Sequence, residues 1–258
     1  MTSPRGRADS PVALVTGGGS GIGRASALAF ADRGYSVVVV GRRQGALDAT
    51  VDELTQRGAA ALAVRADVSD EADARSMVDQ ALERFGRLDA AANCAAVKPG
   101  EGILNQALAD FDRAIAINLR GVWLSVRFEA LAMRDRGGGS IVNVSSISAV
   151  VGGPADYAAS KAGVEGLTRG AAEELAPSGI RVNVVRAGLF DTPMLHEAWQ
   201  TGDDPATVLA PGAAAAMLRR IGDPMEAAHA VVWLCSPEAS FVTGTCLDVD
   251  GGVLGRWL

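Results

Sequence analysis

A tyrosine and a lysine four residues apart, Tyr157 and Lys161, could together move a proton onto or off a carbonyl oxygen. The residues after them have the spacing of a buried helical stripe: Val164, Leu167, Ala171 and Leu175. Both side chains are therefore expected on one face of a helix. A free tyrosine has a pKa of about 10, and an ammonium group one turn away favours the phenolate and lowers that pKa. We expect Tyr157 to act as a general acid or base near neutral pH.

Ser146 ends the segment 140–146, whose apolar centre and polar end are typical of a buried strand passing into a loop. Its hydroxyl is therefore expected near the same carbonyl, which it could polarise. A tyrosine four residues before a lysine is, by itself, more often a surface contact on a helix. The elements around the three residues must decide between these interpretations.

A glycine-rich turn near the N-terminus favours dinucleotide binding. An apolar strand candidate at 12–16 precedes the turn, and a helical segment at 24–33 follows it. Glycines at 17, 21 and 23 would let the backbone approach a pyrophosphate. Free N–H groups and the positive end of the helix dipole would meet its charge. The alternative, a plain flexible loop, is disfavoured because a strand precedes the turn and a helix follows it, as in dinucleotide-binding folds.

The end of the next strand candidate, 36–40, indicates which dinucleotide binds. An acidic residue there would accept a hydrogen bond from the ribose 2′-hydroxyl of NAD, but the sequence has Gly41, Arg42 and Arg43. Arginine suits the 2′-phosphate of NADP. We predict NADP(H) as the cofactor, with NAD(H) as the second candidate; the alternative interpretation of the arginines is a solvated surface pair.

Two further polar residues follow predicted buried elements. Asp67, with Val68, comes after the strand candidate 61–64, where its carboxylate could meet an adenine or could cap the turn before Ser69; the two roles are compatible. Asn118 lies beside the apolar stripe of the longest helical pattern, 110–136, where a polar side chain needs a partner. A merely tolerated asparagine is the alternative.

Composition limits the function classes. Hydrophobic content of 48%, charged content of 21% and a net charge of −6 describe a globular acidic protein, which disfavours nucleic acid and anionic membranes as partners. Three scattered cysteines predict neither a disulfide framework nor a metal site, and a reducing cytoplasmic location fits best. No apolar segment is long enough to span a membrane, and residues 1–10 lack the apolar core of a signal peptide.

Strand and helix patterns alternate to the end of the chain, so we predict one domain at 11–258 after a flexible tail at 1–10. The composition shifts at about 189–222, which is rich in alanine, proline and glycine and follows a strand end, the usual place of a substrate lid. A plain surface excursion is the alternative. His196 lies in this insertion and is either a substrate contact or an exposed structural residue, whereas His229 is expected to be structural.

From about Pro11 to Gly252 the chain resembles the short-chain dehydrogenase/reductase superfamily in its compact form. The motifs occur in the family's order: Thr16-Gly-x-x-x-Gly21-x-Gly23, Asp67-Val68, Asn118, Ser145-Ser146, Tyr157-x-x-x-Lys161 and Asp248-Val-Asp-Gly-Gly252. Each is weak alone, but six in order are strong support. The resemblance implies an α/β fold, a single-domain Rossmann-type doubly wound sheet of seven parallel strands with helices on both faces.

The resemblance also implies roles for individual residues. Tyr157 would donate or accept the proton, and Lys161 would lower its pKa and bind the nicotinamide ribose. Ser146 would bind the substrate oxygen, and Asn118 would hold a water that relays protons to Lys161. The remaining residues implied at the cofactor are Gly17, Ser20, Gly21, Ile22, Gly23, Arg42, Arg43, Asp67, Val68, Asn93, Gly188 and Thr192. The implied chemistry is hydride transfer between a nicotinamide and a carbonyl or secondary alcohol.

The chain departs from the family pattern in three places. Asn93-Cys94-Ala95-Ala96 stands where Asn-Asn-Ala-Gly is usual, so the Ala96 methyl must fit beside the cofactor with φ below zero. Ala187-Gly188 replaces Pro-Gly. Ser146 and Tyr157 are eleven apart, about two fewer than is common, so Ser145 or Ser148 are alternatives for the serine role.

Two functions follow. The first is a cytoplasmic NADP(H)-dependent ketone reductase or secondary alcohol dehydrogenase, resembling the 3-oxoacyl carrier reductases. The alternative is a non-catalytic dinucleotide-binding protein on the same fold. Because the long helix at 110–136 and the Tyr157 helix carry more apolar surface than one sheet face covers, and because the family usually forms tetramers, we expect a homotetramer.

Overall fold

A computed structural model of the chain describes residues 10–198 and 205–256. The predicted tail, residues 1–10, therefore lies outside the described residues except for Ser10.

Seven parallel strands form one sheet in the order β3-β2-β1-β4-β5-β6-β7. The strands are β1 (Val12–Thr16), β2 (Ser36–Gly41), β3 (Ala61–Arg65), β4 (Ala90–Asn93), β5 (Gly139–Ser146), β6 (Ile180–Ala187) and β7 (Cys246–Val249). β1 and β4 are buried throughout, and β2 is buried at every residue except the last, Gly41, as apolar runs covered on both faces should be. The predicted seven-stranded doubly wound sheet is confirmed.

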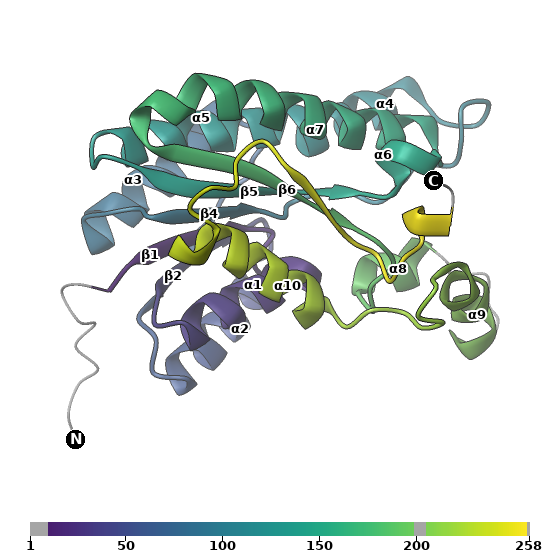
Figure 1. The fold of residues 1–258 in the computed structure, drawn as a ribbon, viewed down its shortest axis with the longest axis horizontal. Helices are drawn as coiled ribbons and strands as arrows, with labels where there is room; N and C mark the ends of the chain where they lie inside the picture. Colours follow the sequence, from purple (N-terminus) through teal and green to yellow (C-terminus); the bar gives the residue numbers. More distant parts are fainter. Residues whose placement is uncertain (1–9, 199–204, 257–258) are drawn as a thin grey trace.

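Helices cover both faces of the sheet (Figure 1). One layer consists of α1 (Gly21–Asp32), α2 (Gln44–Gln56) and α10 (Pro224–Cys235), and the other of α3 (Glu71–Phe85), α4 (Leu108–Ile115), α5 (Gly121–Arg134) and α7 (Ala155–Leu175). Each layer has its own buried apolar cluster against the sheet. The chain reverses its winding between β1 and β4, which opens a crevice at the carboxyl ends of these strands.

The helix predicted at 110–136 is not one regular α-helix. A π-helical turn, η1 (Ala116–Arg120), separates α4 from α5, and Asn118 lies within it. Phe111, assigned to the buried stripe, is instead 39% exposed, whereas Ile117 in the π turn is buried. A π turn adds one residue to the helical repeat, so side chains beyond it change face.

The predicted insertion contains two short helices, α8 (Pro193–Ala198) and α9 (Pro205–Ala215). Phe190 and Gly222 pair across its base in a parallel bridge. The small η4 turn (Leu254–Arg256) comes near it, since Val253 and Leu254 form an apolar cluster with Ile147 and Ala216. No helix among the described residues is long and apolar enough to cross a membrane.

Candidate active site

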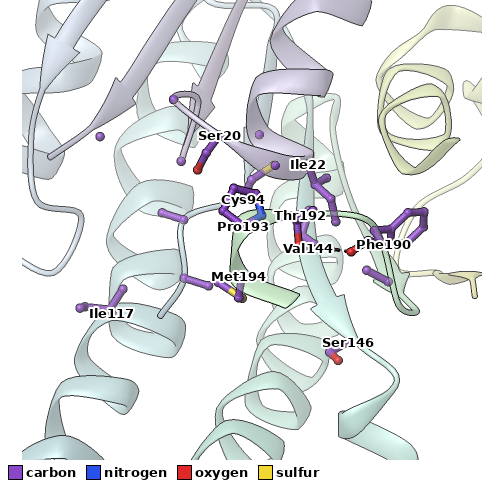
Figure 2. Close-up of a pocket in the computed structure, with 18 of the residues that line it drawn as sticks. Ser20, Ile22, Cys94, Ile117, Val144, Ser146, Phe190, Thr192, Pro193 and Met194 are labelled. Atoms are coloured by element: carbon purple, nitrogen blue, oxygen red, sulfur yellow. Dashed lines mark hydrogen bonds between the residues drawn. The ribbon is translucent and has the colours of Figure 1, made fainter. Parts of the chain in front are cut away.

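A cavity of about 470 Å³ lies at the carboxyl ends of the strands and reaches from the glycine turn to the start of α7. Figure 2 shows Ser20 at one end of this cavity and Ser146 at the other, with Thr192, Pro193 and Met194 between them. Most of the predicted site residues line it: Gly17, Ser20, Gly21, Ile22, Gly23, Arg42, Arg43, Asp67, Val68, Ser146, Tyr157, Lys161, Gly188 and Thr192.

The glycine turn has the close backbone packing and open helix end that a phosphate requires. A Cβ at Gly23 would lie 2.3 Å from the Gly17 carbonyl oxygen, so only glycine fits there. Ser20 is the N-cap of α1 but makes no side-chain capping bond, and the first turn holds no acidic residue. The N–H groups at this helix start therefore face the cavity without a capping side chain, an arrangement that fits a bound pyrophosphate.

The end of β2 carries two cations beside the glycine turn. The Arg42 guanidinium lies 3.8 Å from the Asp67 carboxylate, and Arg43 donates a hydrogen bond to the Ser20 hydroxyl at 3.4 Å. The Asp67 carboxylate also accepts hydrogen bonds from Ser69, which lower its pKa despite partial burial. Asp67 thus caps its turn and faces the cavity, so both roles predicted for it are compatible.

Ser146 and Tyr157 meet at the other end of the cavity. A hydrogen bond with the Ser146 side chain lowers the pKa of the Tyr157 phenol, but burial acts more strongly and raises the pKa to about 12. The Lys161 ammonium nitrogen lies 5.6 Å from the centre of the tyrosine ring and donates to the Val144 carbonyl oxygen at 2.9 Å. Burial lowers the pKa of Lys161 to about 8.

These pKa directions correct one expectation. The spacing of Tyr157 and Lys161 predicted a phenol more acidic than free tyrosine, whereas the structure gives a less acidic one. The reason is that burial disfavours the charged form of both groups, and the Lys161 ammonium is directed to a backbone carbonyl. A phenol with a raised pKa stays protonated at neutral pH, which suits donation of a proton to a carbonyl oxygen.

The short spacing between serine and tyrosine does not displace Ser146. Its neighbour in the sequence, Ser145, also lines the cavity, but its hydroxyl donates to the Lys161 carbonyl oxygen at 3.2 Å. Ser148 lines the cavity, and its backbone N–H donates to the Ser146 hydroxyl at 3.2 Å. Of the three serines, Ser146 is the one whose side chain lowers the pKa of Tyr157.

Asn118 does not contact Lys161 in this structure. Its buried amide accepts from the Val97 N–H at 2.8 Å and donates to the Ser160 hydroxyl at 3.3 Å. The π turn thus places Asn118 between the loop after β4 and α7, while its neighbour Ile117 lines the cavity.

Asn93 was predicted to contact the cofactor, but it does not line the cavity. It is 2% exposed and donates to the Glu129 carboxylate and the Asn143 side chain, both at 3.0 Å. The next residue, Cys94, lines the cavity instead. The side chains of a strand alternate between faces, and the strand end alone does not show which residue points inward.

Several residues that line the cavity have no motif. Ala96, Pro99, Ile117, Pro154, Leu189, Phe190, Met194 and Leu195 form its apolar wall. Ala96, which replaces the family's glycine, has negative φ, as expected. His196 lies outside the wall and pairs with Asp191 at 2.6 Å, which favours the structural interpretation. Among the described residues no group of three metal-binding side chains occurs.

Comparison with known proteins gives concordant matches over nearly the whole chain. Residues 17–254 match a family model described as enoyl-(acyl carrier protein) reductase. The chain is 43% identical to an A-factor type gamma-butyrolactone 1′-reductase of Streptomyces virginiae, covering 98% of each protein. It is also 43% identical to a cis-4-hydroxycyclohexanecarboxylate dehydrogenase of Sinomonas cyclohexanicum, over 93% of this chain and 95% of the relative. A crystal structure of an actinorhodin polyketide ketoreductase variant with NADPH superposes with a TM-score of 0.90 at 34% identity, covering 96% of this chain and 98% of the other.

Proposed function

The chain belongs to the short-chain dehydrogenase/reductase family of oxidoreductases, which use NAD(P) on CH–OH and C=O groups, and from this premise we propose that it is an NADPH-dependent ketone reductase. It would also oxidise the corresponding secondary alcohol. The observation that carries the proposal is that Ser146, Tyr157 and Lys161 line the same cavity as the glycine turn. One end holds the groups that could transfer a proton, and the other end holds the glycine turn that could bind the cofactor phosphates.

The proposed roles follow from these positions. The bound nicotinamide cofactor supplies the hydride. Ser146 orients the substrate oxygen by a hydrogen bond, and the Tyr157 hydroxyl gives its proton to that oxygen as negative charge develops there. Lys161 holds positive charge next to the phenol, which stabilises the phenolate that remains. Asn118 is proposed to hold the water that returns a proton to Lys161. Thr192 and Gly188 would contact the nicotinamide side of the cofactor. Asn93 would hold the strand end that places Cys94 in the cavity wall.

We assign NADPH over NADH because the end of β2 offers Arg42 and Arg43 and no carboxylate of its own. Asp67 is the one acidic residue in the described lining of the cavity, and Arg42 offsets its charge. The similar ketoreductase that was solved with NADPH supports the same choice. The test compares kcat/KM for NADPH with kcat/KM for NADH. Equal values for the two cofactors, or a higher value for NADH, would defeat the assignment.

The cavity wall supports an uncharged substrate. Charged side chains line the cavity at the glycine-turn end (Arg42, Arg43 and Asp67), whereas Lys161 is the one charged residue in the described wall near Tyr157. An anionic acyl carrier would find no second cation there. We therefore propose a neutral, apolar ketone, and the two relatives named for lactone and cyclohexane compounds favour a ring substrate.

Absorbance loss of NADPH against a panel of ring and open-chain ketones tests the function. We expect turnover on at least one neutral ring ketone and none on charged acyl thioesters. Absence of turnover on every ketone, with NADPH still bound, would favour the alternative of a non-catalytic dinucleotide-binding protein.

Three further assignments belong to this proposal. We propose one catalytic domain at 11–258 whose insertion at 189–222 closes over the substrate, since Phe190, Met194 and Leu195 line the cavity. We also propose a homotetramer, because Trp123 and Leu131 on α5 and Trp233 on α10 are exposed. Light scattering that gives a monomer at micromolar concentration would contradict it. A cytoplasmic location fits the three free cysteines.

A further inference from the structure

A row of polar side chains crosses the sheet immediately beneath the reacting residues. Ser145 on β5, Arg186 on β6 and Asp248 on β7 are paired in register on three neighbouring strands. The next row toward the cavity contains Ser146 and Ala187. Interactions that hold Ser145, Arg186 and Asp248 in place therefore also hold the adjacent strand ends, where Ser146 lies.

Glu165 on α7 connects this row to the catalytic helix. Arg186 makes a two-pronged contact with its carboxylate, from Nε to Oε1 at 2.7 Å and from Nη2 to Oε2 at 2.8 Å. The remaining guanidinium nitrogen, Nη1, donates to the Asp248 carboxylate at 2.5 Å. The arginine and glutamate side chains are only 13% and 9% exposed. A bidentate pair with so little solvent holds both distance and orientation.

Lys161 is tied to β5 at two successive residues. Its ammonium donates to the Val144 carbonyl oxygen, and its own carbonyl oxygen accepts from the Ser145 hydroxyl at 3.2 Å. The same hydroxyl lies 3.0 Å from Glu165 Oε1, one helical turn after Lys161. The ion pair thus sets the orientation of the hydroxyl that contacts the lysine backbone.

We propose that Glu165 and Arg186 are positioning residues, which hold the Tyr157 and Lys161 turns of α7 at a fixed height over Ser146. They touch neither the cavity nor the reacting atoms. Since Tyr157 meets its partner across the gap between α7 and β5, a shift of about 1 Å between these elements would cost on the order of 100-fold in rate. This inference rests on the proposed reductase activity.

The chain provides a matched control on the same strand. Arg181 is another arginine of β6, partly buried at the opposite end of the strand, where it donates to the carbonyl oxygens of Leu234, Ser236 and Val242. Removing either guanidinium leaves buried partners unsatisfied and should lower Tm. Only the loss of Arg186 should also lower kcat.

The test compares Arg186→Met, Arg186→Lys and Arg181→Met with the wild type in kcat, ketone KM, NADPH Kd and Tm. We expect Arg186→Met to lower kcat about 10- to 100-fold while KM and Kd change little, Arg186→Lys to recover part of the loss, and Arg181→Met to lower Tm alone. If Arg186→Met does not fold, Ser145→Ala, which deletes one hydroxyl, is measured in its place and should also lower kcat.

Arg186→Met, or Ser145→Ala in its place, with wild-type kcat would overturn the inference, as would an equal loss of kcat in Arg181→Met. A wild type that turns over no ketone would sink the proposed function, and this inference with it. An active wild type beside an equally active variant overturns the positioning role alone.

Discussion

The Lys161 ammonium lies 5.6 Å from the centre of the Tyr157 ring, yet its hydrogen bond goes to the Val144 carbonyl oxygen at 2.9 Å. Burial therefore determines both pKa values, raising that of Tyr157 to about 12 and lowering that of Lys161 to about 8. The pair is set for proton donation at neutral pH, because the phenol keeps its proton.

This relationship predicts how the two directions of the reaction depend on pH. Alcohol oxidation needs the phenolate, so kcat/KM for NADP⁺, which reports groups of the free enzyme, should keep rising between pH 7 and pH 9. Ketone reduction, followed by kcat/KM for NADPH, should be nearly constant below pH 8 and fall above it, as Lys161 loses its charge. An oxidation rate that levels off near pH 7 would contradict the raised phenol pKa.

Ser146→Ala should lower kcat about 100-fold, because it removes a hydrogen-bond donor to the developing oxyanion. Ser148→Ala is the matched control. Ser148 also lines the cavity, but it reaches Ser146 through its backbone N–H, which the substitution preserves. Equal losses of kcat in the two variants would show that Ser146 has no special role.

Arg42→Ala should raise the KM for NADPH roughly 10- to 100-fold, the range of a charge-assisted bond to phosphate, and leave the KM for NADH unchanged. Arg33→Ala is the control, since Arg33 is another exposed arginine, paired with Glu238 away from the cavity. A similar change in KM for both cofactors would remove Arg42 from the 2′-phosphate.

Glu129 predicts a pH-dependent stability. This fully buried carboxyl accepts from Asn93, its Oε1 has no partner among the described residues, and burial raises its pKa to about 8. Between pH 4.5 and 8 the unfolded chain releases this proton while the folded chain keeps it, so stability falls as pH rises.

Glu129→Gln does not titrate and should lose none of this stability. Its Tm should match that of the wild type near pH 4.5 and exceed it by roughly 5 to 10 °C at pH 8. Thermal denaturation across this range, followed by circular dichroism, makes the comparison. Parallel Tm curves for the two proteins would mean that Glu129 is not buried as a neutral acid.

The positions of the strands along the chain and the glycine turn could be predicted from the sequence because both depend on local patterns. Buried parallel strands such as 36–40 are continuous apolar runs, and the turn needs glycine where a Cβ would strike backbone. The π turn around Asn118 could not be predicted, because its residues form an ordinary helical pattern and only the hydrogen bonds differ.

The sequence could predict those residues of the candidate site that belong to motifs, but not those that only tertiary packing brings to the cavity. Tyr157, Lys161 and Ser146 come together as expected, whereas the burial of Asn93 and the apolar wall at Pro99 and Met194 have no local signal. The direction of the Tyr157 pKa was also missed. Spacing gives the distance to Lys161, but not the depth of burial that outweighs it.

In the proposed reaction, the Tyr157 hydroxyl gives its proton to a ketone held beside Ser146. The chain has two tyrosines, so Tyr35→Phe is a matched control at a residue that packs edge-on against Phe30, away from the cavity. The decisive measurement is kcat for NADPH-dependent ketone reduction, with NADPH Kd alongside, in both single variants. We expect Tyr157→Phe to bind NADPH as the wild type does and to lose about 10²- to 10⁴-fold in kcat, while Tyr35→Phe keeps its rate. A Tyr157→Phe protein that reduces the ketone at close to the wild-type rate would contradict the proposed reaction.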